Sequence, residues 1–192
     1  SHNDIMSLFI DANGTLWVGT RGGGLNKFNA QSQQFSHFRY QIADIHSLSG
    51  DTIKSIYQDV QGTLWFGTYS SGLNKYDPVK ERFGHYKYQE SDPHSLNNNM
   101  VLAIHRNEKS GAAQAPLWFG TLAGGLNRLD PKTQQFTHFK HHSADPGSLS
   151  HDWIWSLYED SHDTLWVGTH GGGLNKLNKQ TGKFKHYRHD PT

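Results

Sequence analysis

The chain has 192 residues, with 18 Lys and Arg against 17 Asp and Glu, so its formal net charge of +1 gives no general field that would attract nucleic acid or an anionic membrane. It contains no Cys, which excludes disulfides, thiolate metal sites and a cysteine nucleophile. No apolar run approaches the roughly 18 residues that span a bilayer, so we expect no insertion of this segment into a membrane.

One motif recurs four times along the chain. The copies read "TLWVGTRGGGLNK" from Thr15, "TLWFGTYSSGLNK" from Thr63, "PLWFGTLAGGLNR" from Pro116 and "TLWVGTHGGGLNK" from Thr164. Their tryptophans are 48, 53 and 48 residues apart. The longer step places five extra residues within "NEKSGAAQAP", between Asn107 and Pro116, where small residues predict a longer surface loop.

Each repeat contains four runs of strand length that are rich in β-branched or aromatic residues. In the second repeat these are "IKSIYQD" from Ile53, "TLWFGTY" from Thr63, "GLNKYDP" from Gly72 and "RFGHYKY" from Arg82. Turn residues separate the runs, and no window shows helical periodicity over ten or more residues. Repeated units of four antiparallel strands predict an all-β fold, a β-propeller. We expect one domain over 1–192 with blades over about 1–46, 47–94, 95–147 and 148–192.

The recurring tryptophans are the predicted core of the blades: Trp17, Trp65, Trp118 and Trp166. Successive residues of a strand point to opposite faces of the sheet, so one indole of each blade can fill the wedge between neighbouring blades. A glycine follows two residues later, and we expect it to admit a neighbouring aromatic ring: Gly19, Gly67, Gly120 and Gly168.

The pattern "LWxGTxxGGLN[KR]", followed by an aromatic strand such as "FSHFRY" or "FKHYRHDP" and then by "SLS", resembles the two-component regulator propeller repeat over essentially the whole chain. The resemblance implies the periplasmic, ligand-sensing region of a bacterial membrane receptor, and many members of that family sense oligosaccharides. It implies that the catalytic output, a histidine kinase or a diguanylate cyclase, lies outside these residues, so we expect no enzyme here. The alternatives are a propeller that binds a partner protein, or the input domain of a diguanylate cyclase receptor.

The ends of the chain fall within the link between two repeats. The opening "SHND" matches "SGDT" from Ser49 and "SHDW" from Ser150, and the chain starts at Ser1 instead of Met. We therefore expect an excised piece of four blades, which is a fragment of a larger propeller or half of a dimeric eight-bladed ring. The other possibilities are that the four blades close into a ring by themselves or form an open arc. An open arc exposes the apolar faces of its two terminal blades, so we expect the protein to form a homo-oligomer, namely a dimer.

Two sets of variable residues are expected at one end of the blades. The residue after "GT" changes in each repeat, as Arg21, Tyr69, Leu122 and His170. The link before each first strand contributes Asn3, Asp51, Asn99 and Asp152, with His2, Asn98, His151 and Trp153 beside them. Polar and aromatic groups around one mouth suit a small polar ligand such as an oligosaccharide. The other interpretation is that the Asp and Asn side chains cap turns.

The remaining motifs indicate no catalytic residue, metal or cofactor. "GGG" at Gly22–Gly24 and Gly171–Gly173 leads into a strand, whereas a phosphate loop leads into a helix, so these glycines predict turns. Asp59 and Asp160 end first strands and are expected to cap turns, and no pair of carboxylates recurs as a general acid and base. Four histidines on separate outer strands lack a second ligand at fixed spacing and are interpreted as structural: His37, His85, His138 and His186.

Overall fold

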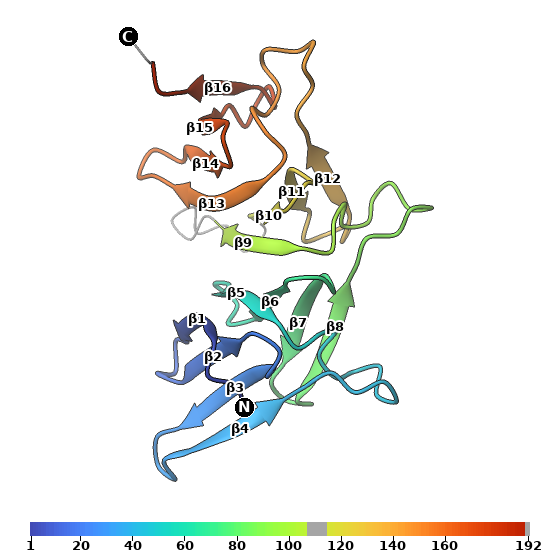
Figure 1. The fold of residues 1–192 in the computed structure, drawn as a ribbon, viewed down its shortest axis with the longest axis vertical. Helices are drawn as coiled ribbons and strands as arrows, with labels where there is room; N and C mark the ends of the chain where they lie inside the picture. The colour runs from blue at the N-terminus through green and yellow to red at the C-terminus, as the bar shows by residue number, and fades with distance from the viewer. Residues whose placement is uncertain (107–114, 191–192) are drawn as a thin grey trace. The chain divides into compact units, whose positions relative to one another are not determined.

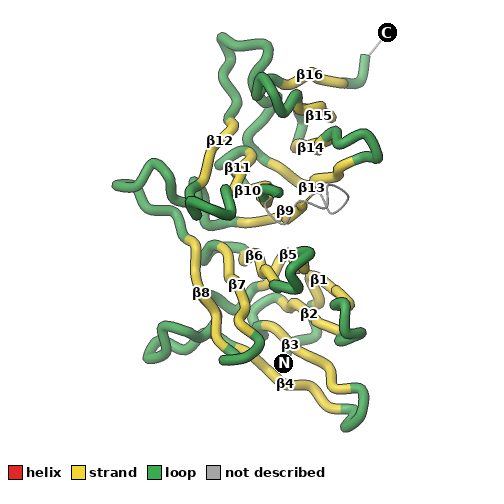
Figure 2. Tube along the Cα trace, turned by 180° about the vertical axis from the view of Figure 1, so that it is seen from behind, coloured by secondary structure: helices red, strands yellow, loops and turns green. Residues whose placement is uncertain are grey.

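The computed structural model describes residues 1–106 and 115–190, which form strands and loops without a helix (Figure 2). The strands of these residues make four antiparallel sheets of four strands each (Figure 1). The prediction of an all-β chain built of four-stranded blades is therefore confirmed. The predicted insertion between Asn107 and Pro116 falls mainly on 107–114, which lie outside the described residues.

Within every sheet the strands are ordered as they follow in the chain, so successive strands pair with one another. The first blade contains β1 (Ile5–Ile10), β2 (Leu16–Thr20), β3 (Leu25–Asn29) and β4 (Gln34–Phe38). The second contains β5 (Ile53–Gln58), β6 (Leu64–Thr68), β7 (Leu73–Asp77) and β8 (Arg82–Tyr86). The third contains β9 (Val101–Arg106), β10 (Leu117–Thr121), β11 (Leu126–Leu129) and β12 (Phe136–Phe139). The fourth contains β13 (Ile154–Glu159), β14 (Leu165–Thr169), β15 (Gly173–Leu177) and β16 (Phe184–Tyr187).

The chain divides into two compact units of two blades each. The first unit, Ser1–Tyr88 with Asn99–Val101, contains the first and second blades. The second unit, Gln89–Asn98 with Leu102–Thr192, contains the third and fourth blades. The single domain over 1–192 stays a prediction.

An aromatic cluster joins the two blades of the first unit. The ring of Trp17, only 1% exposed, lies 5.6 Å from that of Phe66 and 5.5 Å from that of Tyr76, both in the second blade. Leu48, from the link between the blades, is fully buried in the same cluster. Trp17 thus occupies the wedge between two sheets, and burial of such a ring is among the larger stabilising terms of a fold.

The second unit repeats this arrangement with other side chains. Trp118 packs in one cluster with Leu149 and Ile154, which belong to the following link and the fourth blade. The rings of Phe139 and Phe184 meet across the two blades at 6.0 Å. The fourth-blade tryptophan, Trp166, is partly exposed. Each unit is therefore stabilised by face-to-face packing of its two sheets.

The glycine after the tryptophan lets the next blade approach at Gly19 and Gly120, but the prediction of an aromatic neighbour there is wrong. A Cβ at Gly19 would lie 2.9 Å from Cβ of Ile53, and one at Gly120 would lie 2.8 Å from Cβ of Ile154. The neighbour is therefore the β-branched side chain that opens the next inner strand. The rings meet instead farther along the outer strands, as Phe139 does with Phe184.

Candidate functional site

A backbone hydrogen bond places the residue after "GT" beside the residue that precedes the inner strand. Tyr69 N donates to Thr52 O at 3.0 Å, and His170 N donates to Trp153 O at 2.9 Å. Arg21 N donates to Asp4 O at 2.9 Å in the first blade. The turn and the link therefore lie side by side in the first, second and fourth blades.

The first unit presents charged and aromatic groups at these positions. Arg21 Nε forms an exposed ion pair with Asp4 Oδ2 at 2.9 Å. Tyr69 is 47% exposed, and Asn3 is exposed. Exposed ion pairs contribute little to stability, so Arg21 and Asp4 remain available to a ligand at little cost.

The fourth blade gathers two tryptophans and two histidines in one cluster. The ring of His170 lies 4.9 Å from Trp153, 6.1 Å from Trp155 and 6.0 Å from His151. The side chains of Trp153 and Trp155 are exposed, at 36% and 49%. His151 Nδ1 accepts a hydrogen bond from Trp153 N at 3.0 Å, which fixes the turn. We call these four residues the Trp–His cluster.

Sequence reasoning named three members of the Trp–His cluster and missed Trp155. The spacing of Trp153 and Trp155 could have identified it, because residues two apart in an extended segment point to the same face. Leu122, at the equivalent position of the third blade, is half-buried and brings no polar side-chain atom. The prediction that the variable residues of all four blades surround one end of a common central axis stays a prediction.

The acidic and amide residues before each inner strand hold the link in place. Asp51 Oδ1 accepts a hydrogen bond from Tyr40 N, Asn99 Oδ1 from Tyr88 N and Asp152 Oδ1 from His141 N, each at 2.7 Å. Their backbone carbonyls also accept N–H groups of the preceding blade's glycine turn, as Asp51 O does from Gly24 N at 2.8 Å. This geometry favours the turn-capping interpretation of Asp51, Asn99 and Asp152 over ligand contact.

Three of the four outer-strand histidines, His85, His138 and His186, contact backbone carbonyls, whereas His37 contacts the side chain of Asn26. Nε2 of His85 lies 2.8 Å from Ser47 O, and Nε2 of His138 lies 2.8 Å from Ser95 O. Burial lowers the pKa of His138 below its ordinary value. Over residues 1–106 and 115–190, no group of three or more His, Asp or Glu side chains has an arrangement that could hold a metal ion.

The repeated sheets and their shared packing define a propeller-type, all-β protein, and the comparisons identify the repeat. The family described as "Two component regulator propeller" matches residues 1–22, 47–70 and 148–171. These three segments, one each in the first, second and fourth repeats, therefore match the two-component regulator propeller repeat that the sequence motif resembles. The comparison with curated proteins found no match.

Two similar solved structures are extracellular domains from B. thetaiotaomicron. That of BT3049, described as a hybrid two-component system, is 32% identical with a TM-score of 0.84, over 98% of this chain and 25% of that one. That of BT4673, described as a one-component system, is 26% identical with a TM-score of 0.74, over 96% of this chain and 25% of that one. This chain thus spans about a quarter of the length of these relatives.

A more distant similarity supports the fold alone. PorZ of Porphyromonas gingivalis is 13% identical with a TM-score of 0.68, over 95% of this chain and 27% of that one.

Together, the repeat family and the extracellular domains point to a non-catalytic module. The described part of the chain has no helix long and apolar enough to cross a membrane.

Proposed function

We propose that this chain is part of the extracytoplasmic, periplasmic sensor region of a bacterial two-component receptor. The observation that carries the proposal is the match of 98% of the chain, at 32% identity, to the extracellular domain of BT3049. The repeat family supports the same role. The kinase or other output domain then lies elsewhere in the receptor.

The ligand is a small polar molecule, an oligosaccharide, and the Trp–His cluster is the part of the chain best suited to hold it. Exposed indole rings stack against the apolar faces of sugar rings, while imidazole nitrogens donate to or accept from hydroxyl groups. Trp153 and Trp155 supply the rings, and His151 and His170 supply the polar atoms. A ligand in this position biases the receptor toward one dimer arrangement, because it binds that arrangement more tightly.

Calorimetry with a panel of neutral oligosaccharides tests the binding role. We expect heat of binding for at least one saccharide, and we expect Trp153→Ala and Trp155→Ala to weaken it by about fivefold or more each. Tyr158→Ala is the matched control, since Tyr158 is an exposed aromatic residue of β13 outside the cluster, at 65% exposure. Absence of heat with every saccharide, or equal weakening by the control, would refute the saccharide site.

Sedimentation of the protein with and without the bound saccharide tests the signalling step. We expect the saccharide to shift the balance between monomer and dimer, or the shape of the dimer. An unchanged profile at saturating ligand would refute dimer rearrangement while leaving the binding result intact.

A further inference from the structure

Most polar atoms on the rings of the Trp–His cluster are hydrogen-bond donors. The indole N–H groups of Trp153 and Trp155 donate and cannot accept. His151 Nδ1 accepts from Trp153 N at 3.0 Å, so the neutral ring of His151 carries its proton on Nε2 as a further donor. His170 adds one donor and the one ring nitrogen left to accept. None of these ring donors has a hydrogen-bond partner among residues 1–106 and 115–190.

The first blade has a carboxylate at a position where the fourth blade has an indole. In the first blade, Arg21 N donates to Asp4 O at 2.9 Å, and the two side chains form an ion pair. In the fourth blade, His170 N donates to Trp153 O at the same distance, so Trp153 occupies the position of Asp4. The charge of the first blade is therefore balanced within the chain, whereas the donors of the Trp–His cluster have no such counterpart.

The carboxylate that precedes Trp153 in sequence is bound elsewhere. Asp152 Oδ1 accepts from His141 N, in the link before the fourth blade, at 2.7 Å. Within the described part of the chain, no Asp or Glu side chain forms an ion pair with His151 or His170. An anionic partner for the donors of the cluster therefore has to come from a ligand.

The positions of Trp153 and His170 stay open to solvent when a neighbouring blade covers the sheet. In the first blade, the second blade packs against Trp17. The side chains of Arg21 and Asp4 are nevertheless 64% and 42% exposed. Exposure is thus a property of this end of a blade, and a ligand can reach the cluster there.

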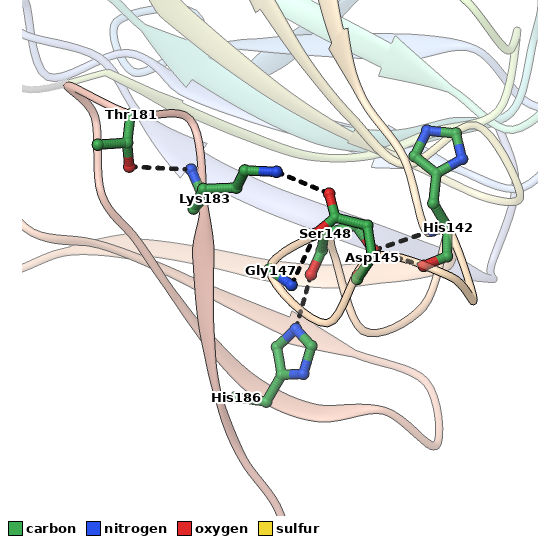
Figure 3. A network of polar contacts seen from close by, with 7 residues as sticks. All are labelled: His142, Asp145, Gly147, Ser148, Thr181, Lys183 and His186. Atoms are coloured by element: carbon green, nitrogen blue, oxygen red, sulfur yellow. Dashed lines mark hydrogen bonds and ion pairs between the residues drawn. The ribbon is translucent and has the colours of Figure 1, made fainter.

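The link that leads to the cluster is fixed to the fourth blade. Asp145 Oδ2 pairs with Lys183 Nζ at 2.7 Å, and Ser148 O contacts His186 Nε2 at 2.7 Å (Figure 3). Groups that are already held in place lose little conformational freedom when a ligand binds. The donors of the cluster are therefore presented in a fixed arrangement.

We propose that the Trp–His cluster selects an anionic sugar, one that carries a carboxylate or a sulfate group; this rests on the saccharide-binding role proposed above. The rings of His151, Trp153 and Trp155 all lie within 6.1 Å of that of His170, so one anionic group beside His170 can reach several donors. A hydroxyl group also has a proton to donate, for which the cluster offers one ring nitrogen, whereas a carboxylate or sulfate only accepts. Hydrogen bonds to a charged acceptor are also the stronger ones.

Calorimetry with matched pairs of trisaccharides tests this selection on the whole 192-residue protein. Galactotriose is compared with trigalacturonate, and cellotriose with its glucuronate counterpart, at constant ionic strength. Each neutral trimer is also compared with its 6-sulfated form, which distinguishes sulfate from carboxylate as the preferred group. We expect the anionic member of at least one pair to bind about tenfold or more tightly than its neutral partner.

His151→Asn tests the donor that the tautomer of His151 provides. Asn keeps an acceptor for Trp153 N but lacks the N–H at the position of Nε2. We expect the preference for the anionic trimer over its neutral partner to fall by about fivefold or more. His162→Asn is the matched control, because His162 is an exposed histidine in the turn at the other end of β13, and it should leave the preference unchanged.

The outcomes separate this proposal from the saccharide-binding role. Equal affinity for both members of every pair that binds, or an equal fall of the preference in His151→Asn and His162→Asn, would overturn the anionic selection and leave saccharide binding intact. Heat from none of the trimers, neutral or anionic, would overturn both. The comparison of the pairs in the unchanged protein does not depend on the folding of a variant.

Discussion

Asp160 Oδ2 accepts a hydrogen bond from the indole Nε1 of Trp166 at 2.8 Å, while Asp160 Oδ1 accepts the backbone N–H groups of His162 and Thr164 at 2.9 and 3.0 Å. One carboxylate therefore caps the turn after the inner strand and orients the tryptophan of the next strand. Asp11 holds Trp17 at 2.8 Å, and Asp59 holds Trp65 at 3.0 Å, in the same way. The capping role expected of Asp59 and Asp160 is thus extended by a bond to the indole ring.

Asp160→Asn is expected to remove part of the acid sensitivity of the protein. The hydrogen bond from Trp166, followed by those from the backbone, lowers the pKa of Asp160 from 3.8 to about 2. A lowered pKa means that the ionised group contributes its full stability above pH 4 and loses it as the pH falls toward 2. Urea unfolding between pH 2 and pH 6 measures the slope, which should flatten in Asp160→Asn and stay unchanged in the control Asp190→Asn.

Gly120→Ala tests the close approach of the third and fourth blades. The added Cβ would lie 2.5 Å from Cγ2 of Ile154, so we expect a loss of about 1–3 kcal/mol in the free energy of unfolding. Gly120→Ala combined with Ile154→Ala should lose less than the sum of the two single changes, because the shorter side chain makes room. Gly84→Ala is the control, as its Cβ would meet only Lys75 O at 3.9 Å. Strict additivity of the two changes would contradict the packing described.

Local patterns were enough to predict the blades, because a strand and a tight turn are specified by neighbouring residues. The runs from Ile53 to Arg82 became β5 to β8, and the glycines of the "GGG" turns adopt positive φ where expected, as Gly22 and Gly24 do. Partners from another blade were harder to predict. Ile53 beside Gly19, or Ser47 beside His85, depends on the register between a sheet and a distant link, which no local pattern contains.

The candidate site shows the same difference between contacts that a local pattern predicts and contacts that it does not. The link and turn positions of His151, Trp153 and His170 follow from strand direction, so their proximity could be predicted. The bonds that Asp51 and Asp152 accept from backbone N–H groups eleven residues away could not be predicted, because they depend on how the link folds in space.

Trp17→Ala is expected to destabilise the protein by about 3–5 kcal/mol, because the ring is fully buried between two sheets. Trp166→Ala should cost clearly less, since Trp166 is partly exposed, although both tryptophans make the same bond to an aspartate. Chemical unfolding of the two variants measures the difference. Equal losses would mean that the carboxylate bond, and not burial, sets the contribution of these residues.

Tyr76→Phe is expected to protect the protein at alkaline pH. Burial, followed by the charges of Glu81 and Asp77, raises the pKa of Tyr76 from 10.0 to about 12. Because the folded state holds the phenol proton more tightly than the unfolded state, the stability is full below pH 10 and falls as the pH rises toward 12. The hydroxyl is buried without a hydrogen-bond partner among the described residues, so its removal should cost little at neutral pH. Unfolding followed from pH 8 to pH 12 should show a flatter decline for Tyr76→Phe than for the unchanged protein, and parallel curves would contradict the burial of this hydroxyl.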